Sequence, residues 1–282
     1  MTHPIGLAAL SVLELEPPDM VTCAVDAGYD RIGLRLIPAT PTEVQHAMVG
    51  DTPLVRETAR RLRDTGMRCL DIEIFRLRPD TKVADYEAAI ATGARLGARE
   101  ALVAGNDPDE SRLTASFAAF CDLAHRYGIG ANLEPMPWTD CRNFAQGARI
   151  VASAGRDNGG VLIDPIHFDR GGSDAHEIAG VPRARLRYMQ LCDAPARRPA
   201  DVEALLHQAR AERLMPGDGG LDLAGILRAV PQDLALSLEI PMQDLARTTP
   251  AVERARRMLA KTRKLLATLA IAPHPQGSPS QR

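Results

Sequence analysis

Short apolar runs alternate with longer segments of helical spacing along the chain. Eight runs have the length of a strand. They lie near Ile5–Leu10, Arg31–Leu36, Arg68–Phe75, Glu100–Ala104, Gly130–Glu134, Gly160–Asp164, Arg187–Cys192 and Ala235–Ile240. Helices are expected between them, for example over Pro53–Thr65, Val83–Leu96, Ser111–Tyr127, Asn143–Ala154, Asp201–Ala211 and Val252–Leu269. Glycine caps the end of several helices, at Gly28, Gly66, Gly97, Gly128 and Gly155.

Eight strand–helix repeats within about one domain length predict an α/β protein with a single (β/α)8 TIM barrel. We expect the barrel to span residues 1–271. An open doubly wound sheet is the alternative, but no GxGxxG motif follows the first run. The segment Met215–Gly220 and the apolar residues after it predict an extra turn and helix in the seventh unit. Residues 272–282 are rich in Pro, Gly and Ser and are expected to be disordered.

Alternation along the strands indicates which side chains face the barrel lumen. In the third run, Leu70, Ile72 and Ile74 are expected to face the helices, and Asp71, Glu73 and Phe75 the lumen. The same rule gives a set of polar lumen positions in the other runs. These positions are Arg35, Asn132, Glu134, Asp164, Gln190, Ser237 and Glu239. A purely structural barrel fills its lumen mainly with branched apolar residues, so this lumen predicts a ligand.

Four of these residues, Glu134, Asp164, Gln190 and Glu239, lie at or near the carboxyl ends of four apolar runs. All four side chains offer oxygen atoms. Oxygen ligands suit cations such as Mg²⁺, Mn²⁺ or Co²⁺ and differ from the thiolate ligands of a cysteine zinc site. Three ionised carboxylates close together repel one another unless a cation neutralises them. Internal ion pairs are the structural alternative, and Arg35 with Glu73 is one plausible pair. We expect one divalent ion at the carboxyl ends of the strands.

Composition narrows the classes of function. The 34 basic and 36 acidic residues almost balance, and only 4% of residues are aromatic, so nothing indicates a nucleic-acid or membrane surface. The five cysteines include no CxxC pair, which fits reduced thiols. The first residues lack the basic region of a signal peptide, and no apolar run approaches the length of a membrane span. A cytoplasmic protein with a small-molecule substrate is expected.

Several short segments together resemble the xylose isomerase-like TIM barrel superfamily. The segments are Leu133–Pro135, Asp164–His167, Gln190–Asp193, Pro216–Gly219 and Leu236–Ile240. That superfamily includes sugar phosphate isomerases and epimerases, keto-sugar 3-epimerases, inosose and dehydroshikimate dehydratases, and endonuclease IV. The resemblance implies one Mn or Mg type ion, with Co or Zn possible, held by Glu134, Asp164, Gln190 and Glu239.

The resemblance also implies that His167 lies beside the substrate. Gln190 departs from the keto-sugar epimerases, which have histidine at this position, and is similar to some dehydroshikimate dehydratases. Endonuclease IV needs further histidines at strand ends, and the third and fourth runs contain none. Related barrels form dimers or tetramers, so a homo-oligomer is possible.

The residue types suit proton transfer next to a carbonyl group. A divalent ion would stabilise an enediolate, and Glu134 and Glu239 would remove and return the proton. The leading hypothesis is therefore an isomerase or epimerase of a hydroxy-carbonyl carbohydrate. A metal-dependent lyase with His167 as acid or base is the second, and a non-catalytic sugar-binding barrel the third. Expected substrate contacts are Arg35, Glu73, Phe75, Trp138 and Arg170.

Overall fold

The expected barrel is confirmed in the computed structural model, which describes residues 3–271. Eight parallel strands form one sheet in the order β6-β5-β4-β3-β2-β1-β8-β7. The two end strands meet through a parallel bridge between Ile163 and Met189. There the Gln190 N–H donates to the Ile163 carbonyl oxygen at 2.9 Å. The sheet therefore closes on itself. The tail expected to be disordered, 272–282, lies outside the described residues.

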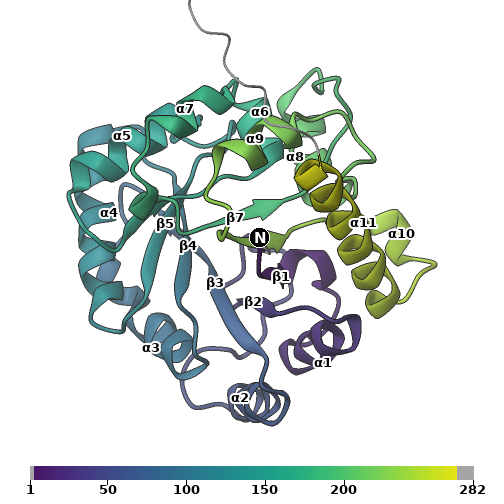
Figure 1. The fold of residues 1–282 in the computed structure, drawn as a ribbon. Helices are drawn as coiled ribbons and strands as arrows, with labels where there is room; N and C mark the ends of the chain where they lie inside the picture. The colour runs from purple at the N-terminus through teal and green to yellow at the C-terminus, as the bar shows by residue number, and fades with distance from the viewer. Residues whose placement is uncertain (1–2, 272–282) are drawn as a thin grey trace, which may run out of the picture.

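A ring of helices surrounds the strands (Figure 1). The strands are β1 Ile5–Leu7, β2 Arg31–Arg35, β3 Arg68–Leu77, β4 Glu100–Gly105, β5 Gly130–Glu134, β6 Gly159–Val161, β7 Tyr188–Leu191 and β8 Ala235–Leu238. The helices are α1 Pro17–Ala27, α2 Pro53–Thr65, α3 Glu87–Arg95, α4 Glu110–His125, α5 Phe144–Ala154, α6 Pro165–Arg170, α7 Ala175–Ala179, α8 Val202–Ala211, α9 Leu223–Ala229, α10 Gln243–Ala246 and α11 Ala251–Ile271. Three 3-10 turns, η1 Ala9–Val12, η2 Val83–Tyr86 and η3 Arg183–Arg185, complete the chain.

Most helix boundaries follow local signals. Gly28, Gly66 and Gly155 cap α1, α2 and α5 with positive φ angles of 86°, 69° and 63°, which side chains other than glycine rarely adopt. The single helix expected over Val83–Leu96 is instead divided into η2 and α3. The seventh unit holds both α8 and α9, which confirms the extra helix expected after Met215–Gly220.

Apolar side chains form two layers, one between strands and helices and one inside the lumen. The inner cluster contains Leu70 and Ile74 together with Tyr188 of β7, so the prediction that these two β3 residues face the helices is wrong. Strict alternation fails because the pairing register of β3 shifts twice. One shift lies opposite Ile32–Gly33 of β2, and the other lies between Ile72 and Phe75 against β4.

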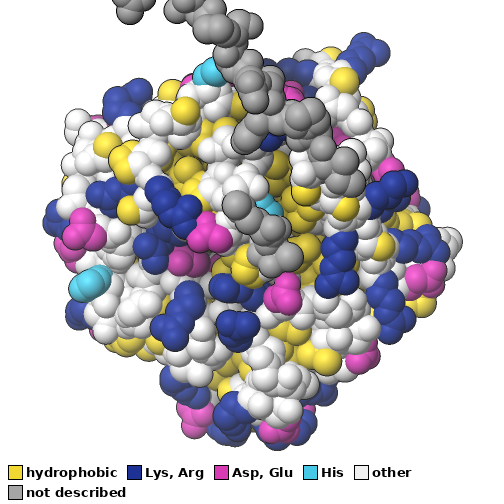
Figure 2. Space-filling view, in the orientation of Figure 1, with side chains coloured by type: hydrophobic (Ala, Val, Ile, Leu, Met, Phe, Trp, Pro, Cys, Tyr) yellow, Lys and Arg dark blue, Asp and Glu magenta, His cyan; other side chains and the backbone are white. Residues whose placement is uncertain are grey.

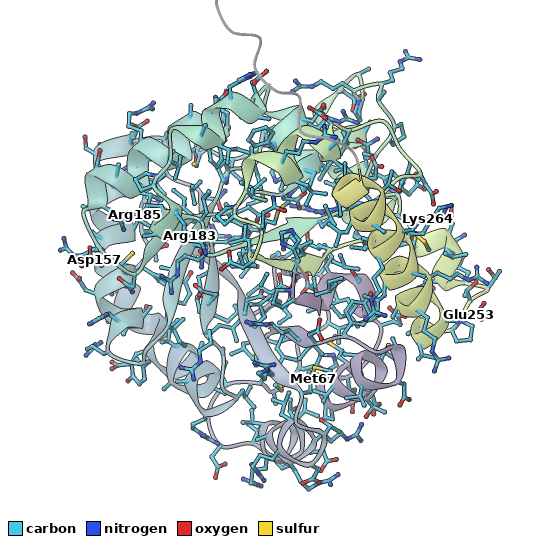
Figure 3. The ribbon with its side chains drawn as sticks, in the orientation of Figure 1. Met67, Asp157, Arg183, Arg185, Glu253 and Lys264 are labelled. Atoms are coloured by element: carbon cyan, nitrogen blue, oxygen red, sulfur yellow. The ribbon has the colours of Figure 1, made fainter. Side chains whose placement is uncertain are left out.

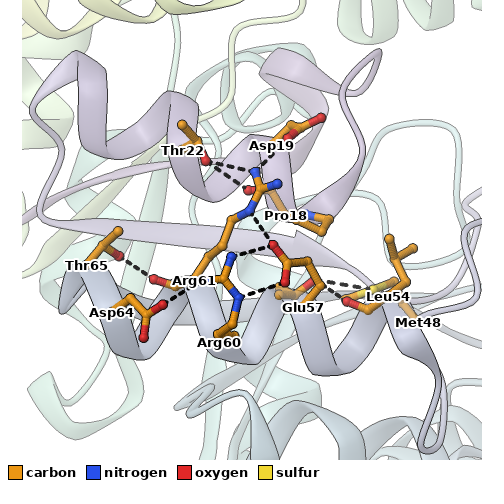
Figure 4. A network of polar contacts seen from close by, with 11 residues as sticks. Pro18, Asp19, Thr22, Met48, Leu54, Glu57, Arg60, Arg61, Asp64 and Thr65 are labelled. Carbon is orange, nitrogen blue, oxygen red and sulfur yellow. Dashed lines mark hydrogen bonds and ion pairs between the residues drawn. The ribbon is translucent and has the colours of Figure 1, made fainter.

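The outer surface is rich in arginine that is held in ion pairs. Arg61 of α2 contacts Asp19 of α1 at 2.6 Å and Glu57 of its own helix at 2.9 Å, and Arg60 contacts Asp64 within α2 at 2.6 Å (Figure 4). Exposed pairs of this kind contribute about 0–1 kcal/mol each, so they keep the surface solvated more than they stabilise the fold. Among residues 3–271, none of the helices combines the length and apolar character needed to cross a membrane.

Candidate metal and active site

A pocket of about 370 Å³ opens where the strands end, the face on which barrel enzymes carry their sites. Its polar lining comes from five strand-end regions and from the segment after α8. Polar residues that line it include Arg35, Glu73, Glu134, Trp138, His167, Arg213 and Glu239. Asp164 and Gln190 do not line this pocket, but both are buried in contact with residues that do. The four expected metal ligands are therefore neighbours.

Glu134, Asp164 and His167 form one half of the site. Glu134 is the last residue of β5, and Asp164 caps α6 by accepting a hydrogen bond from the Ile166 N–H at 3.1 Å. His167 lies three residues after Asp164, so both side chains point from the same side of α6. Its Nε2 atom is 3.6 Å from a carboxylate oxygen of Glu134 and 3.6 Å from one of Asp164. One ligand atom from each residue lies within 4.8 Å of the others.

Gln190, Glu239 and Arg213 form the other half. The Gln190 Nε2 atom donates to Glu239 Oε1 at 2.8 Å. The Arg213 guanidinium lies between two carboxylates, with Nη1 2.6 Å from Asp164 Oδ2 and Nη2 2.7 Å from Glu239 Oε2. Arg213 therefore partly neutralises the carboxylates of Asp164 and Glu239, two of the residues that the sequence analysis assigned to a metal ion.

The chain around Arg213 is fixed by the ends of the last two strands. Leu214 exchanges backbone hydrogen bonds with Asp193 just after β7, at 2.8 and 2.9 Å, and the Arg213 N–H donates to the Pro241 carbonyl oxygen after β8 at 3.0 Å. The buried Asp193 carboxylate accepts from the N–H groups of Gly217 and Gly219, each at 3.0 Å. The Gln190–Asp193 and Pro216–Gly219 segments therefore form one structural unit that positions Arg213.

The two glutamates are hard to ionise in this environment. Burial, together with the charges of Glu73 and Asp164, raises the pKa of Glu239 to about 8, although Arg213 acts in the opposite direction. Burial raises the pKa of Glu134 well above its usual range, and Glu239 and Asp164 add to the effect. Glu239 therefore retains its proton near neutral pH unless a further positive charge enters the site, and burial disfavours the ionised form of Glu134 in the same way.

Asp164 and His167 shift in the other direction. Burial alone would raise the pKa of Asp164, but Arg213 and His167 outweigh it and the pKa is lowered. Burial lowers the pKa of His167 to about 4, with Asp164 opposing the shift and Arg213 supporting it. His167 is therefore neutral at physiological pH, which suits an imidazole that accepts a proton or binds a metal.

The donor set fits a divalent ion. Gln190 Oε1 is buried and has no hydrogen-bond partner, whereas its Nε2 atom bonds to Glu239. An orphaned buried carbonyl oxygen beside three carboxylates and a neutral imidazole is the arrangement that a cation would satisfy. The alternative of internal ion pairing is also observed, since Arg213 bridges Asp164 and Glu239. The raised pKa values of Glu134 and Glu239 indicate that Arg213 alone does not balance the negative charge of the site.

The outer part of the pocket carries arginine and one aromatic ring. Arg35 contacts Glu43 at 2.9 Å and Glu73 at 3.4 Å, which confirms the expected pairing with Glu73. Arg76 and Arg210 also line the pocket. Trp138 packs edge-on against His167, with ring centroids 4.8 Å apart. This wall offers guanidinium groups to an anionic substrate and an apolar face to a ring.

Two expected substrate contacts are wrong. Phe75 is fully buried in the helix layer, 5.2 Å from the ring of Tyr86 and 5.1 Å from that of Phe120, because the register shift in β3 turns it outward. Arg170 is also fully buried, and it donates to Gln208 Oε1 at 3.3 Å and to the Pro195 carbonyl oxygen at 2.5 Å. Its guanidinium ties α6 to the segment before α8 and does not line the pocket.

Arg213 was not expected from the sequence. It follows the end of α8 and belongs to neither an apolar run nor a helix face, so no periodicity identifies it. It is also one of many arginines in a chain that contains only three lysines. Its proximity to the Pro216–Gly219 segment was the one available signal.

A closed parallel barrel carries carboxylates, a glutamine and a histidine together at the carboxyl ends of its strands. The chain belongs to the xylose isomerase-like TIM barrel family, whose model matches residues 21–264. One solved structure, described as the IOLI protein with a binding zinc atom, superposes with a TM-score of 0.77 at 18% identity. That match covers 94% of this chain and 99% of the other.

Two characterised relatives share part of the chain. The 3-dehydroshikimate dehydratase of Pseudomonas aeruginosa is 32% identical over 104 residues, which are 36% of this chain and 16% of that protein. The inosose isomerase of Bacillus velezensis is 27% identical over 113 residues, 39% of this chain and 38% of that protein. The matched segment is therefore well under half the length of either relative.

Proposed function

We propose that this protein is a divalent-metal-dependent enzyme that removes a proton from the carbon beside a carbonyl group of a hydroxylated substrate. The observation that carries the proposal is the set of groups at the strand-end site. Three carboxylates, one unpartnered amide oxygen and one histidine lie together there, and the buried Arg213 contacts two of the carboxylates, those of Asp164 and Glu239. Proteins place such groups together where a cation and an acid–base reaction require them.

Glu134, Asp164, Gln190 and Glu239 would hold the ion, and His167 is close enough to take part. A bound divalent ion would supply a Lewis acid for the negative charge that develops on the substrate's carbonyl oxygen. Glu134 and Glu239 border the pocket and would remove and return the proton. Arg213 would keep Asp164 ionised and hold the carboxylate of Glu239 in place.

Among the possible outcomes, dehydration of a hydroxy-keto acid is the best supported. Arg35, Arg76 and Arg210 face the pocket, and guanidinium groups recognise carboxylates through paired hydrogen bonds. The match to a 3-dehydroshikimate dehydratase supports an acidic substrate as well. In such a reaction the neutral His167, whose Nε2 atom is 3.6 Å from Glu134, would remove the α-proton and then pass it to the departing hydroxyl group, which would leave as water.

Isomerisation or epimerisation of a hydroxy-carbonyl carbohydrate is the second candidate. Two glutamates with raised pKa values border one pocket, and the pKa of Glu239, about 8, lets this residue hold or release a proton near neutral pH. Such a pair can remove a proton and return one to the same or the next carbon. The match to an inosose isomerase supports this outcome. Its product would lack the conjugated chromophore of a dehydration product.

Metal content tests the shared part of the proposal. Wild-type protein and Glu134→Ala/Glu239→Ala, both purified without chelator, are analysed for Mn, Mg, Co and Zn and then titrated with Mn²⁺. We expect about one ion per wild-type chain and at least a 100-fold loss of affinity in the variant. A matched control is Glu57→Ala/Glu110→Ala, which removes two glutamates from the helix surface. Wild-type protein that binds no Mn²⁺ would refute the proposed function.

Once a substrate of the enzyme is identified, the His167→Asn variant distinguishes dehydration from isomerisation or epimerisation. If the reaction is a dehydration that uses His167, activity should fall by at least 1,000-fold, within the range that one acid–base group contributes together with its positioning. If the two glutamates exchange the proton alone, the loss should be partial. Ultraviolet absorbance of the product gives an independent answer, since only dehydration creates a conjugated or aromatic chromophore.

A further inference from the structure

A second hollow lies at the opposite end of the barrel, where the strands begin. It has a volume of about 620 Å³ and is lined by five arginines. They are Arg31, Arg63, Arg68, Arg95 and Arg99. Figure 3 labels Met67, another lining residue, on this face, and Figure 2 shows dark-blue basic side chains around its centre. The hollow is therefore remote from the pocket at the strand ends.

Most of these charges have no acidic partner. Arg95 contacts the exposed Asp51 at 3.3 Å, but within residues 3–271 none of the other four arginines forms an ion pair. The nearby carboxylates are engaged elsewhere. Asp30 accepts a hydrogen bond from the Ile5 N–H at 2.9 Å, and Glu100 contacts Arg187 at 2.8 Å. The hollow thus concentrates positive charge that the ion pairs of the described residues compensate only in part.

Strand pairing brings two of the arginines together. Arg31 of β2 lies directly opposite Arg68 of β3 in the parallel register. Like charges at facing positions are destabilising. Burial lowers the pKa of Arg31 and the charge of Arg68 lowers it further, whereas Asp30 and Glu100 act in the opposite direction without outweighing them. The Arg31 Nε atom is buried and has no hydrogen-bond partner. An anion between the two guanidinium groups would remove the repulsion and satisfy this donor.

Helix ends account for two of the five charges. Arg63 and Arg95 lie in the last turns of α2 and α3, where a cation interacts favourably with the helix dipole. Arg31 and Arg68 begin strands, and Arg99 lies directly before β4, so none of these three has that role. Three guanidinium groups at the edge of one hollow therefore remain without a structural explanation.

We propose that this hollow binds a small phosphate-bearing anion, such as a phosphate ester or pyrophosphate. Planar guanidinium groups present paired N–H donors that match phosphate oxygens, and several of them suit a ligand with more than one negative charge. The volume lies within the range of small-molecule sites. The site is separate from the proposed catalytic pocket, so its existence does not depend on the proposed reaction.

Calorimetric titration of chelator-treated protein with pyrophosphate and with inorganic phosphate tests the proposal. The test variant is Arg68→Gln/Arg99→Gln, which changes two exposed side chains. The matched control is Arg142→Gln/Arg228→Gln, which removes the same charge from two exposed arginines outside the hollow. Neither pair alters a residue of the strand-end pocket. Anion binding in the strand-end pocket would therefore have the same affinity in the wild type, the test variant and the control.

We expect wild type and control to bind one pyrophosphate per chain and the test variant to bind at least tenfold more weakly. Thermal unfolding gives a second readout: pyrophosphate should raise the Tm of wild type and control but not that of Arg68→Gln/Arg99→Gln. Equal affinity in all three proteins would overturn the proposal, because the anion would then bind elsewhere. Absence of binding to wild type at about 150 mM ionic strength, where exposed charges are screened, would overturn it too.

Discussion

Arg213 shows how one side chain can control the charge of a whole site. It is almost fully buried, and its guanidinium contacts Asp164 at 2.6 Å and Glu239 at 2.7 Å. Removing one partner of a buried ion pair costs about 3–5 kcal/mol, because the remaining charge is left without compensation. A divalent ion bound by the same carboxylates would supply that compensation instead.

Arg213→Met should therefore destabilise the metal-free protein by about 3–5 kcal/mol, and Mn²⁺ should restore a large part of the loss. Denaturant unfolding with and without Mn²⁺ measures both effects. The control is Arg254→Met, which removes another buried arginine, one that pairs with Glu14 away from the site. It should lose stability without rescue by Mn²⁺. The same response to Mn²⁺ in both variants would show that Arg213 does not share its carboxylates with a metal.

At the scale of elements, the loop after α8 depends on one buried carboxylate. Asp193 follows β7 and accepts four backbone hydrogen bonds, from Ala194 at 2.8 Å, Gly217 and Gly219 at 3.0 Å, and Leu221 at 3.2 Å. The loop carries Arg213 between the ends of β7 and β8. The strands therefore fix the positions of the carboxylates, and this loop determines where the guanidinium group of Arg213 lies between them.

Asp193→Ala should loosen the loop and lower activity by about 10- to 100-fold, because small displacements of catalytic groups have effects of this size. Asp193 itself does not line the pocket. Hydrogen exchange of residues 213–221 and the kcat of the variant measure the two effects. Asp222→Ala is the matched control. It removes only the cap of α9, which costs about 1 kcal/mol and should leave kcat unchanged. Unaltered exchange in Asp193→Ala would contradict this account.

At the scale of the whole molecule, the site links stability, pH and metal binding. The pKa of Glu239 is raised from 4.5 to about 8, so the folded metal-free protein keeps a proton that the unfolded chain releases. Stability from this group is present below pH 4.5 and is lost as the pH rises towards 8. His167 affects the stability of the folded protein at acidic pH. Its pKa is lowered from 6.5 to about 4, so stability falls as the pH drops through that window.

A metal ion must displace the proton of Glu239, and this contribution should raise Mn²⁺ affinity with pH by up to about tenfold per unit and level off above pH 8, with a further rise wherever a proton of Glu134 is also displaced. Titrations at four pH values between 6 and 9 measure the slope. Glu239→Gln should bind more weakly and with a shallower pH dependence, because the titrating group is gone. An affinity for Mn²⁺ that stays constant across this range would contradict the link between metal and proton.

The predictability of the site differed from residue to residue. Glu134, Gln190 and Glu239 were located at strand ends because period-two alternation in short, regular strands identifies the lumen side. The same rule failed for Phe75 and Ile74, because β3 shifts its register against both neighbours. Those shifts depend on the pairing of three strands and leave no local signature.

By itself, the sequence determined the repeated strand–helix order, the barrel and the positions at which polar groups reach its carboxyl end. These features follow from the periodicity of apolar residues, which is local. Only the tertiary structure decided that Arg213 joins Asp164 to Glu239, that Phe75 and Arg170 turn away from the pocket, and that Arg31 faces Arg68. Contacts between distant segments depend on strand register and loop conformation, which emerge only when the whole sheet closes.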